Sequence, residues 1–141
     1  MATVSVAATF YLAANGVTVM CPDADVGQTG EVNGIVYTKR SKAQIRSLAD
    51  GRDYGPLATT CTSGVTSMVD MFYYHRSFNQ DIGSWDVSNV TNMNYMLGHA
   101  SSFNRDLSGW CVSNIASEPN DFDDGATSWV LARPVWGTCP S

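Results

Sequence analysis

The sequence repeats itself with a period of 25 residues. Residues 61–85 read CTSGVTSMVDMFYYHRSFNQDIGSW, and residues 86–110 read DVSNVTNMNYMLGHASSFNRDLSGW. Aligned without a gap, the segments share identical residues at pairs that include Met68/Met93, Phe78/Phe103 and Trp85/Trp110. A fixed period of about 20–50 residues is typical of stacked architectures, because one unit cannot bury its own apolar face. The period therefore constrains the fold more than any single motif does.

Each unit has two parts with different hydrophobic periods. In the first part, Met93, Met96 and Leu97 lie at i, i+3 and i+4, which is the stripe of a helical turn. In the second part, residues 104–107 favour a short strand, and Trp110 follows in a turn. We expect the repeated methionines and aromatic residues to form the core. The pattern predicts an α+β fold, a short solenoid with one helical turn and one short strand per unit.

The flanking segments are expected to close the two ends of this array. In residues 1–60, two Asn-Gly pairs predict β-hairpins, and a capping box that begins at Ser41 predicts a short helix over 42–50. Residues 111–115 begin a third unit, after which the apolar stripe is lost. The predicted organisation is one folded domain with an N-terminal cap (1–60), two repeats (61–110), and a partial third repeat with an irregular C-terminal cap (111–141).

The four cysteines bracket the two flanking segments. Cys21 and Cys61 lie on either side of the segment before the repeats, and Cys111 and Cys139 on either side of the segment after them. Three pairings are possible, and this placement favours Cys21–Cys61 and Cys111–Cys139; the alternative is four buried free thiols. Each loop would contribute about 3.5–4 kcal/mol of chain entropy. Two disulfides would imply an oxidising compartment, which is extracellular or at the cell surface.

Several motifs resemble one known family of repeats. Residues 78–82 (FNQDI), 85–93 (WDVSNVTNM) and 103–104 (FN) resemble the BspA-like bacterial surface-protein repeat of about 25 residues, which also occurs in mycoplasma lipoproteins and marine microbes. The resemblance implies a leucine-rich-repeat-like solenoid, secretion, and cell-surface adhesion or protein binding, with no catalytic motif to carry over. The sequence departs from that pattern at Leu97, where Phe is usual, and at 73–76, where small residues are usual.

Charge and hydropathy exclude two classes of partner. The net charge is −5, and the eight lysines and arginines are scattered along the chain, so the basic footprint of a nucleic-acid-binding protein is absent. No apolar run approaches the roughly 18 residues of a membrane span. We expect a protein partner, a cell-surface or assembly component, with carbohydrate as the alternative ligand and no cofactor.

The most unusual local cluster is Phe72-Tyr-Tyr-His-Arg76. Tyrosine and arginine are the side chains favoured as anchors in protein interfaces. The sequence therefore predicts that Tyr73, Tyr74 and Arg76 contribute to a partner surface. The alternative is a bulky helix end that packs on the N-terminal cap.

Two groups of acidic residues are candidate calcium ligands. Asp81 and Asp106 occupy equivalent positions of the two repeats, where a cation could bridge them. Asp121, Asp123 and Asp124 resemble half of a calcium loop but lack the distal glutamate. A solvated turn is the preferred interpretation of the second group, and exposure or bridging backbone N–H groups would equally explain the first, so no metal site is assigned.

Two further features bear on modification and catalysis. Asn89-Val-Thr91 is a sequon for N-glycosylation, although a turn and helix cap explains the same residues. His75 and His99 lie near no nucleophile or carboxylate pair that the sequence identifies. No catalytic residue is therefore assigned, and the chain is not expected to be an enzyme.

Three functions remain open at this point. The preferred function is a non-catalytic secreted or cell-surface binding or adhesion module, with an accessory subunit of a larger assembly as one form of it. The second is a purely structural spacer or cap domain, which a surface without an exposed aromatic patch would favour. The third is an enzyme or a carbohydrate-binding module, which would require a deep cleft or exposed Trp85 and Trp110.

Overall fold

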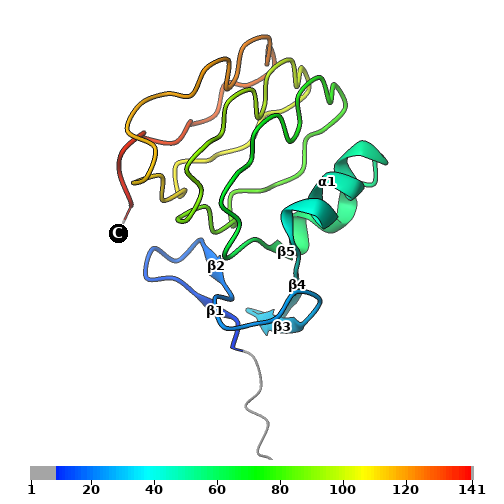
Figure 1. Ribbon diagram of the computed structural model, residues 1–141, viewed down its shortest axis with the longest axis vertical. Coiled ribbons are helices and arrows are strands. Elements are labelled where there is room, and N and C mark those ends of the chain that lie inside the picture. Colours follow the sequence, from blue (N-terminus) through cyan, green and yellow to red (C-terminus); the bar gives the residue numbers. More distant parts are fainter. Residues whose placement is uncertain (1–8, 141) are drawn as a thin grey trace, which may run out of the picture.

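The computed structural model describes residues 9–140, so residues 1–8 of the predicted N-terminal cap and residue 141 lie outside it. Within this range, every regular element precedes residue 62 (Figure 1): β1 (Tyr11–Leu12), β2 (Val19–Met20), β3 (Thr29–Val32), β4 (Ile35–Lys39), α1 (Lys42–Asp50), the 3-10 helix η1 (Gly55–Thr59) and β5 (Thr60–Cys61). β1 and β2 form an antiparallel pair. In the second sheet, β4 lies between β3, which is antiparallel to it, and β5, which is parallel.

The predicted hairpins and helix are confirmed. The Asn15-Gly16 pair turns the chain between β1 and β2, and Asn33-Gly34 does so between β3 and β4. Asn33 and Gly34 both have positive φ, at 52° and 82°, which is the conformation that a tight hairpin requires. Helix α1 begins after Ser41, whose side chain accepts from the Gln44 backbone N–H, and the Gln44 side chain accepts in return from Ser41.

The predicted fold class, an α+β leucine-rich-repeat-like solenoid, is wrong. No α-helix or strand occurs in the described residues from 62 to 140, which form turns, bends and one isolated bridge between Ser67 and Asn92. The fold is a small arrangement of sheet and loop with one helix and two small sheets. The helical stripe fails because Tyr95 and His99 have positive φ, at 63° and 55°, and an L-residue in this region cannot continue a right-handed helix.

Backbone hydrogen bonds nevertheless connect residues that lie about one period apart. The N–H groups of Met68 and Phe72 donate to the carbonyls of Asn92 and Met96, and Leu97 donates to Phe122. Figure 1 shows the corresponding green, yellow and orange loops side by side, with the two hairpins at one end and α1 along one side. These bonds satisfy main-chain groups that a helix or sheet would otherwise pair.

Most of the buried apolar side chains belong to these loops. The repeated methionines are fully buried, as the core interpretation predicts, and so are the repeated phenylalanines and tryptophans. Helix α1 and η1 contribute Ile45, Ala49 and Leu57 to the same core. Each of three buried tryptophans also donates its indole N–H to a main-chain carbonyl at 2.9–3.0 Å: Trp85 to Leu57, Trp110 to Ile82 and Trp129 to Arg105.

Both favoured cysteine pairs are disulfide-bonded. The Cys21–Cys61 disulfide is buried in a second, smaller core. The two hairpins contribute Val19, Val32 and Tyr37 to this core. Cys111–Cys139 joins the beginning and end of the last segment, and Cys139 is exposed. The division of the chain into residues 1–60, 61–110 and 111–141 stays a prediction.

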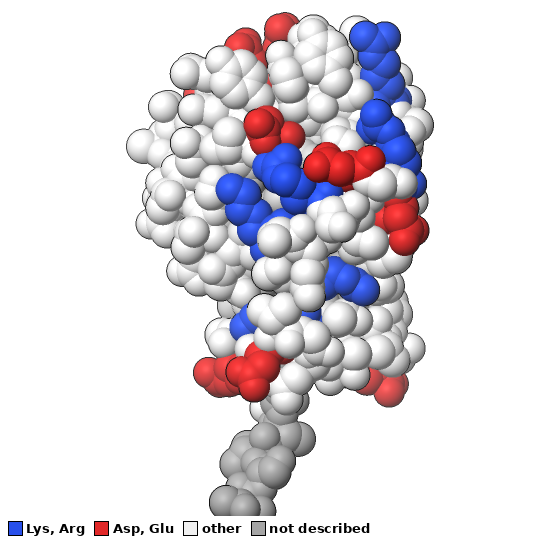
Figure 2. Space-filling view, turned by 45° about the vertical axis from the view of Figure 1, so that its right-hand side comes forward, with Lys and Arg blue, Asp and Glu red and all other residues white. Residues whose placement is uncertain are grey.

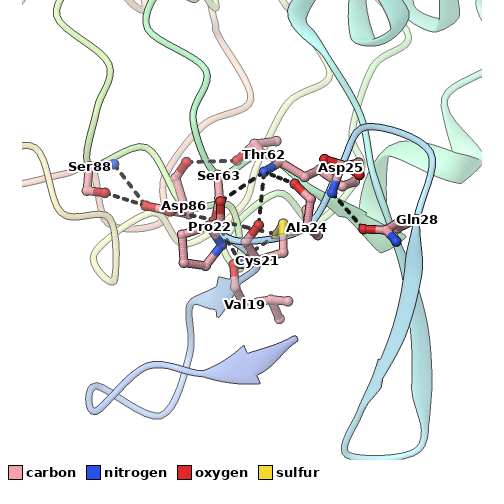
Figure 3. The surroundings of a disulfide bond; sticks show 12 residues. Val19, Cys21, Pro22, Ala24, Asp25, Gln28, Thr62, Ser63, Asp86 and Ser88 are labelled. Carbon is pink, nitrogen blue, oxygen red and sulfur yellow. Dashed lines mark hydrogen bonds between the residues drawn. A yellow bond between two sulfur atoms is a disulfide. The ribbon is translucent and has the colours of Figure 1, made fainter. Parts of the chain in front are cut away.

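A buried polar network joins the hairpin region to the loops (Figure 3). The Asp86 carboxylate, which is buried, accepts hydrogen bonds from the hydroxyls of Ser63 and Ser88 at 2.7 and 2.6 Å, and Ser63 in turn accepts from the Cys21 N–H. The Lys39 ammonium donates to three carbonyls, those of Cys21, Pro22 and Ala24. Because every charge here has hydrogen-bond partners, the network tolerates burial.

Candidate functional site

Three tyrosines and a histidine form an exposed aromatic cluster on the loops, which we call the tyrosine patch: Tyr73, Tyr74, Tyr95 and His99. The tyrosines are 36–45% exposed. The ring centroid of Tyr73 lies 4.5 Å from that of Tyr74 and 5.5 Å from that of Tyr95, both edge to face. The patch is therefore one contiguous surface built from two loops that are distant in sequence.

The backbone at this patch has an unusual conformation. Tyr74, Tyr95 and His99 have φ values of 61°, 63° and 55°, in the left-handed region that glycine adopts readily and bulky residues avoid. Each such residue costs about 1–2 kcal/mol relative to the right-handed conformation. The three aromatic residues thus occupy corners where glycine would be less strained, which directs attention to a role beyond folding.

Two glycines make room for the aromatic rings. A Cβ atom on Gly98 would come within 2.9 Å of the Tyr73 ring and within 3.0 Å of the Asp121 carbonyl oxygen, so any larger residue would displace the tyrosine. Gly125 lies directly against the His99 imidazole in the same way. The glycines of one loop therefore hold the rings of the preceding loop in place.

The rings of the patch also contact one another and a neighbouring arginine. Tyr74 and His99 are stacked with centroids 4.4 Å apart and planes 9° apart, and the Arg76 guanidinium carbon lies 5.7 Å from the Tyr74 centroid. Burial and the neighbouring Tyr74 raise the pKa of Tyr73 above the ordinary tyrosine range. The patch can thus offer ring surface, a phenolic hydrogen-bond donor and one guanidinium.

The sequence identified half of this surface. Tyr73, Tyr74 and Arg76 lie together and are exposed, but Tyr95 and His99 were missed. The period relates Tyr95 to Asp70 and His99 to Tyr74, but only the structure shows that all four residues are corners with positive φ. Whether the predicted residues contact a partner stays a prediction.

His75 is a structural residue at the edge of the patch. It is 7% exposed, and its Nδ1 atom lies 2.7 Å from the Arg52 guanidinium and 2.8 Å from the Tyr54 hydroxyl. Because a guanidinium can only donate, Nδ1 accepts, and the neutral ring carries its proton on Nε2, which faces Asp50 at 3.6 Å. Burial lowers the pKa of His75, and the positive charge of Arg52 lowers it further.

The candidate calcium ligands have other partners in the structure. Asp81 and Asp106 line one groove of about 600 Å³, where each accepts a backbone N–H two residues later, from Gly83 and Ser108. Hydrogen bonds from Ser108 hold the pKa of Asp106 below its usual range. Within residues 9–140, no three His, Cys, Asp or Glu side chains come together as a metal site would require.

The second acidic group is divided among different neighbours. Asp123 forms an ion pair with Arg133 at 3.0 Å, and Asp124 lies 3.9 Å from His99. Asp121 occupies a corner with a φ of 50° and is exposed. Asn89, the sequon residue, is exposed in a turn, and its modification stays a prediction.

The wider surface has a mixed charge distribution. On the face drawn in Figure 2, acidic and basic side chains lie interspersed, and neither sign forms a large continuous area. No helix in the described part of the chain is long and apolar enough to cross a membrane.

One comparison with known proteins gave a match. Residues 49–132, more than half of the chain, match the protein family described as "Mycoplasma protein of unknown function, DUF285". Searches of curated proteins and of solved structures found no significant match.

Proposed function

This chain belongs to the DUF285 family of proteins of unknown function, and from its own surface we propose that it is a non-catalytic extracellular binding or adhesion module whose tyrosine patch contacts a protein partner. The observation that carries the proposal is the patch itself, in which three exposed tyrosines lie together and two of them, Tyr74 and Tyr95, have strained backbone. Local strain that the rest of the fold sustains is found preferentially at functional sites.

The composition of the patch favours a protein as the partner. Tyrosine supplies a large, rigid contact area with few rotatable bonds and a polar end, and tyrosine and arginine are enriched among residues that dominate binding energy. Contiguous exposed apolar or aromatic surface on a small protein marks interaction sites. The edge-to-face packing of Tyr73 on both Tyr74 and Tyr95 pre-organises the cluster, which lowers the entropic cost of binding.

The structure does not show the features that would favour the two alternatives, a carbohydrate-binding module and a structural spacer. A carbohydrate platform on Trp85 and Trp110 would need exposed rings, and both side chains are fully buried. One face of the Tyr74 ring is covered by His99, which leaves less flat surface for stacking on a sugar. A pure spacer would be favoured by a surface without an exposed aromatic cluster, whereas this surface has one.

Two observations support the extracellular and non-catalytic parts of the proposal. The buried Cys21–Cys61 disulfide and the Cys111–Cys139 disulfide are typical of proteins that fold in oxidising compartments. His75, whose pKa is lowered by burial, is enclosed between Arg52 and Tyr54 and has no free lone pair for a substrate.

The test is selection of binders on the intact protein. A phage-displayed library of random peptides is selected on immobilised wild-type protein, and each selected peptide is then measured on a Tyr73→Ala/Tyr95→Ala variant. Because the patch offers the pre-organised aromatic surface, we expect most selected peptides to lose at least tenfold in affinity on this variant.

The matched control is Tyr11→Ala, which removes a tyrosine of similar exposure (43%) from strand β1. The selected peptides should bind this variant as tightly as the wild type, provided both variants retain the wild-type circular dichroism spectrum. Peptides that bind the Tyr73→Ala/Tyr95→Ala variant undiminished would refute the patch as the binding site.

A further inference from the structure

Arg76 differs from every other arginine in the described chain. The others donate hydrogen bonds to protein acceptors: Arg40 to Thr60, Arg46 to Asp70, Arg52 to Tyr54 and His75, Arg105 to Asn79, and Arg133 to Asp123 and Trp129. Within residues 9–140, the Arg76 guanidinium has no such acceptor, and no carboxylate lies within 4.0 Å of it. The guanidinium instead lies over the Tyr74 ring. A guanidinium carries five donors, so this side chain has hydrogen-bonding capacity left for a ligand.

The same arginine lines a hollow that offers further donors. A depression of about 250 Å³ is lined by Arg76, His99, Ser101, Gly125 and Thr127. Ser101 and Thr127 carry hydroxyl donors and His99 an imidazole, so the lining contains donor groups besides the guanidinium. The hollow adjoins the tyrosine patch, because His99 belongs to both and Arg76 lies over Tyr74.

The charges around the hollow limit which anion it can accept. Asp124, the carboxylate that faces His99, lies 3.9 Å from Nε2, and its side chain is 67% exposed. Such an exposed pair contributes little, about 0–1 kcal/mol. Asp124 is not among the residues that line the hollow. It does repel anions, and the repulsion is greater for a doubly charged phosphate than for a singly charged carboxylate.

We propose that Arg76 and the hollow beside it hold the carboxylate of an Asp or Glu side chain from the protein partner, while that partner's apolar surface covers the tyrosine patch. This inference rests on the proposed function and specifies its partner. Arginine is suited to the role because its planar donors match a carboxylate with two parallel hydrogen bonds. Burial of this pair by the partner would strengthen it relative to an exposed ion pair.

The first test uses acetate as a carboxylate probe. The ¹⁵N-labelled protein is titrated with sodium acetate at constant ionic strength, and the Nε–H resonances of all six arginines are followed by NMR, together with the backbone amides of Ser101 and Thr127. We expect saturable shifts at Arg76, Ser101 and Thr127 and only small, linear shifts at the other arginines. A parallel titration with sodium sulfate should shift the Arg76 signal less at equal ionic strength.

Two variants make this titration decisive. Arg76→Gln should abolish the saturable shifts at Ser101 and Thr127, whereas Lys42→Gln, which removes an exposed positive charge from α1, should leave them intact. Equal responses at all arginines, or shifts that persist at Ser101 in Arg76→Gln, would overturn the proposal.

The second test uses the peptides selected on the wild-type protein. We expect them to share an acidic residue, and Arg76→Gln should weaken their binding about tenfold. Replacing that acidic residue by its amide should weaken binding to the wild type equally but should have no further effect on Arg76→Gln, which is the signature of a direct pair.

The outcomes separate this inference from the proposed function. Peptides that depend on Tyr73 and Tyr95 but are insensitive to Arg76→Gln would overturn the carboxylate anchor and leave the tyrosine patch standing. Peptides that depend on neither would overturn both.

Discussion

The two regions of this molecule are stabilised in different ways. Residues 9–61 contain all of the described helices and strands, yet their own core is a small cluster around the Cys21–Cys61 disulfide. Residues 62–140 contain no regular element but supply most of the large core, with Trp85 and Trp110 fully buried. The regular elements therefore lie in one part of the chain, and most of the buried apolar side chains lie in the other.

This difference shows that loops can build a core when their polar backbone groups have partners. In residues 62–140 those partners are carbonyls of the next loop and side chains at fixed positions: the Asn79 Oδ1 accepts the N–H of Asn104, and the Asn104 Oδ1 accepts the N–H groups of Val130 and Leu131. Backbone groups that have such partners can be buried beside apolar side chains at little cost.

The largest expected effect comes from a tryptophan in the loop core. Trp110→Ala removes a fully buried ring and its hydrogen bond to the Ile82 carbonyl, so we expect a loss of about 3–5 kcal/mol in the free energy of unfolding. Val32→Ala, in the small core, should cost only about 1–3 kcal/mol. Urea titrations followed by circular dichroism measure both values, and a larger loss for Val32→Ala would reverse the comparison.

The disulfides should differ in accessibility more than in contribution to stability. Their sequence separations of 40 and 28 residues predict similar contributions, about 4 and 3.5 kcal/mol. Cys21 and Cys61 are buried, whereas Cys139 is exposed, so a mild thiol reductant should open Cys111–Cys139 first. Alkylation of the released thiols followed by peptide mass mapping gives the order. Release of Cys21 and Cys61 first would show that the hairpin region opens more readily than its burial indicates.

Asp86 tests the junction between the two regions. Asp86→Ala removes the acceptor for the hydroxyls of Ser63 and Ser88 and should lower the free energy of unfolding by about 1.5–3 kcal/mol. Asp86→Asn keeps one acceptor oxygen and should cost less. The exposed Asp81→Ala, which loses one backbone hydrogen bond, should cost about 0.5–1.5 kcal/mol. Calorimetric melting of the three variants should follow this order, and an Asp86→Ala variant as stable as Asp81→Ala would contradict it.

His75 gives the interface between α1 and the loops a dependence on pH. Burial and Arg52 lower the folded-state pKa of His75, so the unfolded chain binds a proton more readily. Stability should therefore be full above the ordinary histidine pKa of about 6.5 and should fall as the pH decreases below it, towards the lowered folded-state pKa. Urea midpoints measured between pH 7.5 and 5 should fall in the wild type and flatten in His75→Gln. An unchanged slope in His75→Gln would assign the dependence to other groups.

The smallest change in stability is expected at the tyrosine patch, where one substitution should affect binding but not folding. Tyr95→Gly places glycine at a φ of 63°, so relief of backbone strain should offset the lost packing and leave stability unchanged or raised by up to about 1 kcal/mol. Peptide binding should fall at the same time. Tyr73→Gly is the control, because Tyr73 is not among the described residues with positive φ and glycine there should destabilise the protein. Thermal melting and peptide titration of both variants distinguish these results.

Local and strongly patterned features could be predicted from the sequence. Asn-Gly turns and the Ser41/Gln44 capping box depend on neighbouring residues alone, so they follow from chemistry within a few positions. Burial of the repeated methionines and tryptophans follows from their spacing and apolar character. The cysteine pairs could be chosen because each pair brackets one segment.

The conformation of the repeats could not be predicted by the same rules. Spacing at i, i+3 and i+4 indicates a helix only when the intervening residues remain right-handed, and Tyr95 and His99 do not. Propensities reserve the left-handed region for Gly, Asn and Asp, so tyrosines there give no warning. The patch was half-missed for the same reason, since its corner residues could not be identified as corners.

After residue 115, the spacing between equivalent residues becomes 26 instead of 25. This extra residue hides from a sequence comparison how far the loop pattern extends. Gly125 and Ala126 lie 26 residues after His99 and Ala100, and Gly125 shares the positive φ of His99. Trp129 donates its indole N–H to the Arg105 carbonyl, as Trp110 does to Ile82. An ungapped comparison at 25 residues misaligns these positions, so the sequence after residue 115 reads as irregular.

The corner positions, which are the loop residues with positive φ, carry side chains that lie outside the core. Their identity can therefore change while the buried side chains stay the same. Five corners with positive φ each directly precede a buried residue, yet their own side chains are exposed or half-buried: Asp70, Tyr74, Tyr95, His99 and Asp121. A combinatorial library that varies only these five positions would change the aromaticity and charge of the surface without altering a fully buried side chain. The fold could thus serve as a scaffold for new binding specificities, with glycine at any corner as the neutral starting point.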